Sequence, residues 1–145
     1  MTSFTKQDSR YTWEINDGVL HIFPKEEFRD LLLEELLAVR VARFSVKRNT
    51  SCWDFEDRLF GTPEIQAIVE ANDIDRSGLN FTGAYIPQLG RDFSLNVSNM
   101  TLVDILNKVI KESPVARFWM IKKNSSSRTV LVRLNARHEP DGSRR

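Results

Sequence analysis

The residues most suggestive of ligand chemistry lie in the stretch 73–78, Asp-Ile-Asp-Arg-Ser-Gly. Oxygen-bearing side chains at alternate positions, Asp73, Asp75 and Ser77, followed by a glycine match the first half of a calcium-binding loop. The position at which such a loop supplies its bidentate glutamate holds Ala84, so any calcium affinity should be low. The alternative is a turn that caps the preceding helix, because aspartate side chains often bond to nearby backbone amides.

The single cysteine, Cys52, is a candidate nucleophile. It follows the expected N-cap of a helix, where the helix end lowers a thiol pKa. A cysteine enzyme also needs a histidine partner, but His21 is expected in a strand and His138 in the C-terminal tail. Because free cysteines are often buried as small apolar side chains, that role is favoured here. One cysteine also excludes an intramolecular disulfide.

The carboxylates Asp54, Glu56 and Asp57 form a group that acid–base catalysis could use. Their pattern is more typical of a solvated helix face, on which Asp54 favours the positive helix end. A small hydrolase built on Asp73 and Asp75 is the enzyme alternative. The sequence contains no histidine–cysteine cluster with zinc spacing and no glycine-rich phosphate loop after a strand. It therefore predicts no cofactor and no catalytic residues, and it favours a protein that is not an enzyme.

Basic residues adjoin aromatic ones in the segment 117–133, as at Arg117-Phe118-Trp119. Aromatic side chains that stack on bases beside basic groups are typical of single-strand nucleic-acid binding. The whole chain, however, has 21 basic and 20 acidic residues and a net charge of +1, so no overall positive field attracts a polyanion. An edge hairpin that its charges keep soluble explains the same pattern. Nucleic-acid binding is therefore the less favoured interpretation.

Aromatic residues that could contact a protein partner are Trp53, Phe55, Tyr85 and Trp119. Trp53 stands out because it adjoins Cys52 and lies off the apolar stripe of its predicted helix. An exposed Trp53 beside Phe55 would mark a partner-binding patch. Tyr85 lies in the irregular stretch 72–90, which is long for a structureless connection and is predicted to be either a functional loop or the site of a short strand.

The composition of the 145 residues, 41% hydrophobic and 28% charged, is typical of one globular domain. No apolar run approaches the roughly 18 residues that span a bilayer, so no membrane span is predicted. The N-terminal residues lack the apolar core of a secretion signal. As written, the chain is expected to be cytoplasmic, and it would be periplasmic if a native signal peptide had been removed.

Hydrophobic periodicity and turn residues divide the chain into a polar arm (1–10), one domain (11–134) and a tail (135–145) that is predicted to be disordered. Asp17-Gly18 between aromatic and β-branched runs predicts a β-hairpin over 11–24. The other predicted elements are helices over 25–37, 52–60, 63–71 and 102–112, and strands over 39–47, 92–97, 117–122 and 129–134. This order predicts an α+β fold, with helices packed on a mixed or antiparallel sheet and a hairpin at each end.

A faint internal repeat with a period of about fifty residues supports two strand–helix units within this domain, 39–71 and 92–134. Residues 51–55 align with residues 101–105, and a short strand signal precedes each copy. Ser51 and Thr101 are the predicted N-caps of the two helices.

The segment 93–121 resembles the short N-terminal domain of bacterial secretins and TonB-dependent receptors. The resemblance is carried by the strand 93–97, the Thr101-Leu102 helix start, the leucine-rich helix that follows and the strand 118–121. It implies a small βαβ module of the periplasm that binds other proteins and is not an enzyme. A weaker second match covers 43–59.

We therefore expect a non-enzymatic protein-interaction module with an adaptor or assembly role. Binding is expected through a sheet edge, by β-augmentation, or through the stretch 72–90. An oligomer is compatible with this role. The alternatives are a small nucleic-acid-binding domain that uses the hairpin 117–133, and a small hydrolase.

Overall fold

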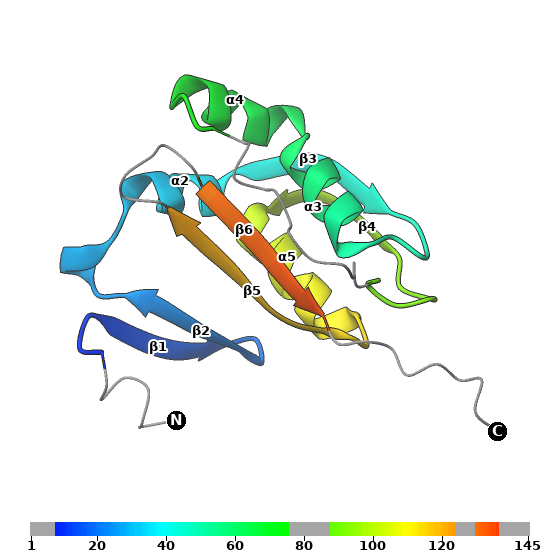
Figure 1. The fold of residues 1–145 in the computed structure, drawn as a ribbon, viewed down its shortest axis with the longest axis horizontal. Helices are drawn as coiled ribbons and strands as arrows, with labels where there is room; N and C mark the ends of the chain where they lie inside the picture. Colours follow the sequence, from blue (N-terminus) through cyan, green and yellow to red (C-terminus); the bar gives the residue numbers. More distant parts are fainter. Residues whose placement is uncertain (1–7, 76–87, 124–129, 137–145) are drawn as a thin grey trace.

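The computed structural model describes residues 8–75, 88–123 and 130–136. Within them, strands and helices follow one another in the order that the sequence predicts (Figure 1). The bounds are β1 (Tyr11–Asn16), β2 (Val19–Pro24), a 3₁₀ turn η1 (Glu26–Phe28), α2 (Leu31–Ala38), β3 (Arg40–Val46), α3 (Cys52–Phe60), α4 (Pro63–Ala71), β4 (Leu95–Thr101), α5 (Leu102–Glu112), β5 (Ala116–Lys123) and β6 (Val130–Ala136). β6 thus includes two residues that the sequence analysis assigned to the tail, Asn135 and Ala136.

The predicted helix 25–37 is wrong in its continuity, because η1 and α2 are separate elements. The break lies at Asp30, whose backbone is extended, with φ −106° and ψ 113°. Its carboxylate accepts hydrogen bonds from the amides of Leu32 at 3.0 Å and Leu33 at 3.3 Å. An aspartate that bonds to nearby amides in this way favours a helix start over a helix interior. Asp30 therefore caps α2, directly after Arg29 at the end of η1.

Replacing this cap, as in Asp30→Ala, is expected to lower the free energy of unfolding by about 1 kcal/mol. The same carboxylate accepts from Lys123 Nζ of β5 at 2.9 Å, which ties α2 to β5. Urea unfolding of the two proteins at neutral pH measures the loss. An unchanged denaturation midpoint would contradict the role of Asp30 as a cap.

The stabilisation by Asp30 should also depend on pH. Burial acts to raise the pKa of this carboxyl, but the bond from Lys123 and the amides of Leu33 and Leu32 outweigh burial and lower the pKa below its ordinary value. The contribution is therefore complete above the unfolded pKa of about 3.9 and is lost as the pH falls through the lower folded value. Unfolding measured from neutral pH downward should show the difference between wild type and Asp30→Ala shrinking in acid, whereas a constant difference would contradict this linkage.

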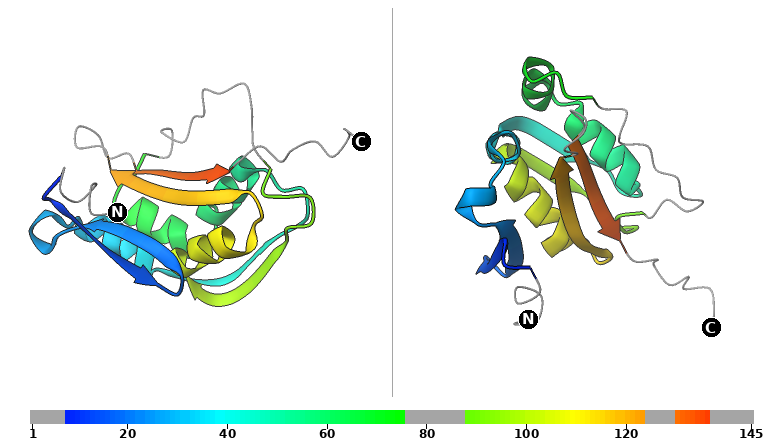
Figure 2. Two further views of the ribbon diagram at one scale, coloured as in Figure 1. Left: turned by 90° about the horizontal axis from the view of Figure 1, so that it is seen from below. Right: turned by 60° about the vertical axis from the view of Figure 1, so that its left-hand side comes forward.

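The strands of the described residues form three antiparallel ribbons of two strands each: β1–β2, β3–β4 and β5–β6. Helices pack on these ribbons, which confirms the α+β class. The ribbons do not join into the single sheet that the sequence analysis expected. Figure 2 shows the β5–β6 ribbon on one side of α3 and α5, and the β3–β4 ribbon on the other.

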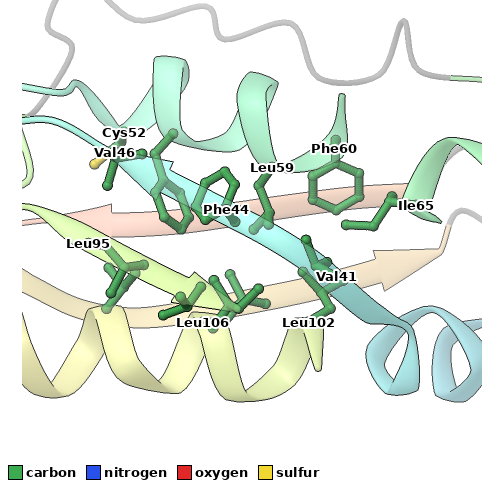
Figure 3. Close-up of a cluster of buried hydrophobic side chains, with 14 of the residues drawn as sticks. Val41, Phe44, Val46, Cys52, Leu59, Phe60, Ile65, Leu95, Leu102 and Leu106 are labelled. Atoms are coloured by element: carbon green, nitrogen blue, oxygen red, sulfur yellow. The ribbon is translucent and has the colours of Figure 1, made fainter. Parts of the chain in front are cut away.

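The hydrophobic core lies between these ribbons and helices. Figure 3 shows side chains from β3, β4, α3 and α5 converging in one cluster. The apolar stripe of α5 is completely buried, as periodicity at i, i+3, i+4 and i+7 predicts for a core-facing helix. Its members are Leu102, Ile105, Leu106 and Val109.

Both predicted N-caps of the internal repeat are confirmed. Ser51 Oγ accepts from the amide of Asp54 at 3.1 Å, and Thr101 Oγ1 accepts from the amide of Asp104 at 3.2 Å. The strands that precede the two helices, β3 and β4, pair with each other. The connections differ, because β4 runs directly into α5 whereas residues 47–51 separate β3 from α3. The repeat therefore holds for the capped helix starts and not for the links that lead to them.

The segment 93–121 keeps the order strand, helix, strand in β4, α5 and β5. β4 pairs with β3, and β5 pairs with β6, so the two strands of this segment lie in different ribbons. In a βαβ unit the helix connects two parallel strands of one sheet. The described topology of this segment therefore differs from such a unit.

Candidate functional site

The N-terminal hairpin forms where the sequence predicts it. Asp17 and Gly18 occupy the turn between β1 and β2 with φ values of 50° and 77°, the left-handed conformation that a two-residue turn needs. The turn fixes the register, which places Trp13 opposite Ile22 and Ile15 opposite Leu20. Directly opposed residues share one face of a ribbon, as do residues two apart in a strand. Both pairs therefore lie on the same face.

This face carries a group of exposed apolar side chains. We call it the hairpin face, and its members, with their exposed fractions, are Tyr11 (36%), Trp13 (40%), Ile15 (63%), Leu20 (37%) and Ile22 (47%). Single exposed apolar residues are normal on protein surfaces, but a contiguous group marks an interaction site. Tyrosine and tryptophan are moreover enriched at protein interfaces. The hairpin face is therefore the candidate functional site.

The opposite face of the ribbon packs toward α5, and β2 is the nearer strand (Figure 1). It carries Val19, His21 and Phe23, all half-buried. At the turn, Asp17 forms an ion pair with Lys111 of α5. Because α5 holds this inner face, the hairpin face is directed away from the core.

A chain of polar contacts from three elements fixes the ribbon to the helix. Trp119 Nε1 of β5 donates to Asn107 Oδ1 of α5 at 2.9 Å, and Asn107 Nδ2 lies 3.3 Å from His21 Nε2 of β2. An indole N–H can only donate, so the amide oxygen of Asn107 faces Trp119 and its NH₂ group faces His21. In this contact the NH₂ group of Asn107 donates and His21 Nε2 accepts. The rings of His21 and Trp119 also meet edge to face, with centroids 6.4 Å apart.

Replacing the central amide, as in Asn107→Leu, should lower the free energy of unfolding by about 1–3 kcal/mol, because the indole N–H of Trp119 loses its acceptor. In a Trp119→Phe background that donor is already gone, so the same replacement should cost at least about 0.5 kcal/mol less. Urea unfolding of the four proteins of this cycle measures the coupling. Strictly additive effects would contradict the contact.

A cavity of about 300 Å³ lies where the hairpin turn meets α5. Its polar lining consists of Asn16, Asp17, Asp104, Asn107, Lys108, Lys111 and Glu112. The charged groups of this lining are engaged within the protein: Lys111 pairs with Asp17, Lys108 pairs with Glu112, and Asp104 accepts from Thr101. A substrate site needs polar groups that converge on the ligand. These groups bind one another instead, and the Asp17–Lys111 pair attaches the hairpin turn to α5.

The four aromatic residues predicted to contact a partner differ in their burial. Phe55 is completely buried and meets Phe44 edge to face, with ring centroids 5.4 Å apart. A ring without exposed surface cannot contact a partner, so Phe55 is a core residue. Trp53 and Trp119 are half-buried, and the indole of Trp119 is bonded within the protein. Tyr85 lies outside the described residues.

The first calcium candidate, Asp73, terminates α4. Its φ is 52°, its amide donates to Glu70 O at 3.2 Å, and the amide of Ile74 donates to Val69 O at 2.9 Å. These two bonds define a helix-terminating motif in which the left-handed position is usually glycine. Asp73 therefore lies in a turn that caps α4 through main-chain hydrogen bonds, whereas the turn expected from the sequence uses an aspartate side chain.

The other two calcium candidates, Asp75 and Ser77, give no further support for a calcium site. Asp75 is exposed, like Asp73, and Ser77 lies outside the described residues. Among the residues that the structure describes, no group of three histidine, cysteine, aspartate or glutamate side chains is arranged to hold a metal ion. Calcium binding stays a prediction of the sequence pattern.

Cys52 is completely buried in the core, as the sequence analysis favoured. Burial, with a smaller effect from Glu56, raises the pKa of its thiol to about 12. The helix N-terminus would lower that pKa, but burial outweighs it, so the thiol stays protonated at neutral pH. A protonated, inaccessible thiol does not act as a nucleophile.

Native Cys52 should consequently react slowly with a thiol reagent such as dithionitrobenzoate. A rise from the ordinary thiol pKa of 9.0 to about 12 lowers the thiolate fraction at mildly alkaline pH by about 1,000-fold. Labelling rates measured with and without denaturant should differ by at least that factor, since burial also blocks access. Similar rates in the two states would contradict the burial of Cys52.

The acidic face of α3 is only partly as expected. Asp54 and Asp57 are exposed, in agreement with a solvated helix face, but Glu56 is 6% exposed. Glu56 lies one helical turn after Cys52, on the stripe that enters the core. The prediction of a uniformly solvated acidic face is therefore wrong at this residue.

The predicted basic hairpin is the β5–β6 ribbon. Phe118 and Met120 are exposed on it, whereas Trp119 and Ile121 are half-buried and pack against the core. The register places Arg133 opposite Met120. One apolar face of β5 is therefore turned to solvent beside a basic position.

No family model matches this chain, and no curated protein or solved structure matches it either. Within the described residues, none of the helices combines the length and the apolar character needed to cross a membrane.

The hairpin face was missed as a site by the sequence analysis, although a signal for it was present. β2 carries apolar residues at both alternating positions, and the Asp17-Gly18 turn sets the register that places the apolar residues of β1 on one of the two faces. A ribbon of two strands that packs on a helix with one face leaves the other face in solvent. Apolar residues on both faces therefore indicate a face left for a partner.

Proposed function

We propose that this protein is a non-enzymatic interaction module, with an adaptor or assembly role, that binds a protein partner through the hairpin face. The exposure of five apolar side chains on one ribbon face is the observation that carries the proposal. Covering such a surface removes apolar area from water, which is the main favourable term in protein association. Trp13 and Ile22, the middle pair of the face, would be the central anchors.

The proposed surface also offers main-chain contacts. Within the described part of the chain β1 pairs with β2 alone, so its other edge is available to a partner strand. A partner segment could thus lie on the hairpin face and extend the ribbon at β1. The strands of 93–121 lie in different ribbons, so the proposal rests on the hairpin face and not on the resemblance of that segment to bacterial envelope domains.

The groups considered for catalysis favour this proposal over an enzyme. The thiol of Cys52 is buried and protonated, and the charged groups around the hairpin cavity bind one another. A hydrolase would need a nucleophile or activated water beside groups that converge on a substrate. The hairpin face is instead apolar, which suits binding.

Quantitative affinity capture with the full chain tests the proposal. Three baits are compared, namely wild type, Ile15→Lys and Leu31→Lys. Each is used to capture partners from a lysate of the source organism. Leu31 on α2 is the matched control, because it is an apolar residue that is 79% exposed and lies off the hairpin face. A genuine partner should be captured by wild type and Leu31→Lys and lost with Ile15→Lys, and the purified partner should bind Ile15→Lys at least about tenfold more weakly. Capture that is equal with all three baits would contradict the proposal.

Single-stranded nucleic-acid binding by the β5–β6 ribbon is the second candidate. It is favoured by one observation, the 53% exposure of Phe118 on a strand that also carries Arg117. Stacking of a base on Phe118 beside basic residues would produce affinity that falls steeply with salt. Titration of a labelled oligonucleotide at two salt concentrations, with Phe118→Ala as the control, tests it. Salt-independent or undetectable binding would contradict it.

A further inference from the structure

We infer that the hairpin face binds a second copy of this chain, so that two ribbons stack face to face in a two-fold dimer. The inference rests on the proposed function, because it uses the same surface and names the partner. The area of the hairpin face, its lack of charge and its shape support a second copy as the partner.

The area of the hairpin face matches what a small homodimer needs. Side chains of this kind present roughly 150–250 Å² each, and between a third and two thirds of each remains exposed, so one face offers on the order of 400 Å² of apolar surface. Two faces together supply on the order of 800 Å². With the apolar share of about 65% that homodimer interfaces show, this corresponds to a total interface of roughly 1,200 Å². That value is at the lower end of specific, stable interfaces.

The charge of the surface and of the chain permits self-association. The five residues of the hairpin face carry no formal charge, so nothing on this surface selects an oppositely charged partner. The net charge of the whole chain is +1, which leaves little repulsion between two copies. Two neutral apolar surfaces can therefore pack against each other without charge repulsion.

The shape of the ribbon suits the same arrangement. Each strand has six residues, so the face is about 20 Å long and two strands wide. Two twisted ribbons of this kind stack about 10 Å apart with their strands inclined by about 30°. A two-fold axis near the middle of the face would bring the Trp13–Ile22 pair of each copy against that of the other. These side chains would form the centre of the dimer interface.

Sedimentation velocity of the full chain, over protein concentrations from about 1 to 500 μM, tests the inference. An interface at the lower end of the stable size range predicts a monomer–dimer equilibrium whose dissociation constant lies within that concentration range. Ile15→Lys and Ile22→Lys should each raise this constant at least about tenfold, while Leu31→Lys should leave it unchanged. Far-UV circular dichroism and urea unfolding confirm that each variant is folded.

A cross-linking experiment provides a second measurement that needs no charged substitution. Cys52 is buried, so the thiol introduced by Ile22→Cys is the one accessible to a short bismaleimide in the native protein. Ile22→Cys should give a covalent dimer at concentrations where Leu31→Cys gives monomer. Equal cross-linking at the two positions would overturn the face-to-face arrangement.

A chain that stays monomeric throughout the concentration range, or a dimer that the hairpin variants do not weaken, overturns the inference. Neither result contradicts the proposed function if affinity capture still finds another protein that binds wild type and does not bind Ile15→Lys. If both the dimer and such a partner fail to appear, the proposed function fails as well.

Discussion

Leu106→Asp is expected to abolish cooperative folding. Leu106 lies at the centre of the buried stripe of α5, with no exposed surface (Figure 3). An unpaired carboxylate there would cost more than about 4–5 kcal/mol, which is a large part of the 5–15 kcal/mol that stabilises a typical domain. A thermal melt followed by far-UV circular dichroism measures the effect.

Two controls make the Leu106 experiment specific to burial. Leu106→Ala removes volume without adding charge and should cost about 2–5 kcal/mol while the protein stays folded. Leu31→Asp adds the same carboxylate to an exposed position of α2 and should change stability by no more than about 0.5 kcal/mol. If Leu106→Asp melted cooperatively near the wild-type temperature, the placement of α5 against the core would be wrong.

The second large effect is expected for Phe55→Ala, which should lower the free energy of unfolding by about 3–5 kcal/mol. The ring of Phe55 is completely buried and meets Phe44 edge to face, so its removal leaves a cavity between α3 and β3. Urea unfolding gives the loss. Labelling of Cys52, one turn earlier on α3, should also become faster as the helix opens more often.

The neighbouring tryptophan provides the comparison for Phe55→Ala. Trp53 is half-buried, so Trp53→Ala should cost clearly less than Phe55→Ala although it removes more atoms. A larger loss for Trp53→Ala than for Phe55→Ala would contradict the orientation of α3.

The elements that the sequence predicted well are those that local chemistry determines. The Asp17-Gly18 turn requires left-handed backbone conformations, and the caps Ser51 and Thr101 supply hydroxyl acceptors to free amides. The apolar period of α5 fixes which of its faces is buried. Each of these features acts over a few residues, so the order of elements and the helix starts could be predicted without knowledge of the fold.

The features that the sequence did not predict depend on contacts between distant segments. The run of leucines after Asp30 favours one continuous helix, so the cap at Asp30 was not predicted. The carboxylate of Asp30 also accepts from Lys123, which lies 93 residues later in the chain. Glu56 lies one turn after Cys52, and its burial depends on how far the buried side of α3 extends, which packing against other elements decides. The division of the strands into three ribbons follows from pairing partners that alternation does not specify.

The candidate site shows the same limit. The residue types indicate single aromatic residues as partner contacts, and one of these residues, Phe55, lies in the core. The predicted Asp17-Gly18 turn implies the pairing of Trp13 with Ile22 and of Ile15 with Leu20, but which face of the ribbon α5 leaves uncovered depends on the fold. The hairpin face depends on strand pairing and on exposure. The residue types alone therefore give only a weak signal for it.

The central claim is that the hairpin face binds protein, and site-specific photo-cross-linking in cells of the source organism tests it most directly. A benzophenone amino acid at position 15 should yield a discrete cross-linked product that contains a second copy of the chain or another protein, while the same amino acid at position 31 should not. The product should disappear when Ile22→Lys is introduced in the same chain. An absence of product at position 15, or equal products at both positions, would contradict the claim.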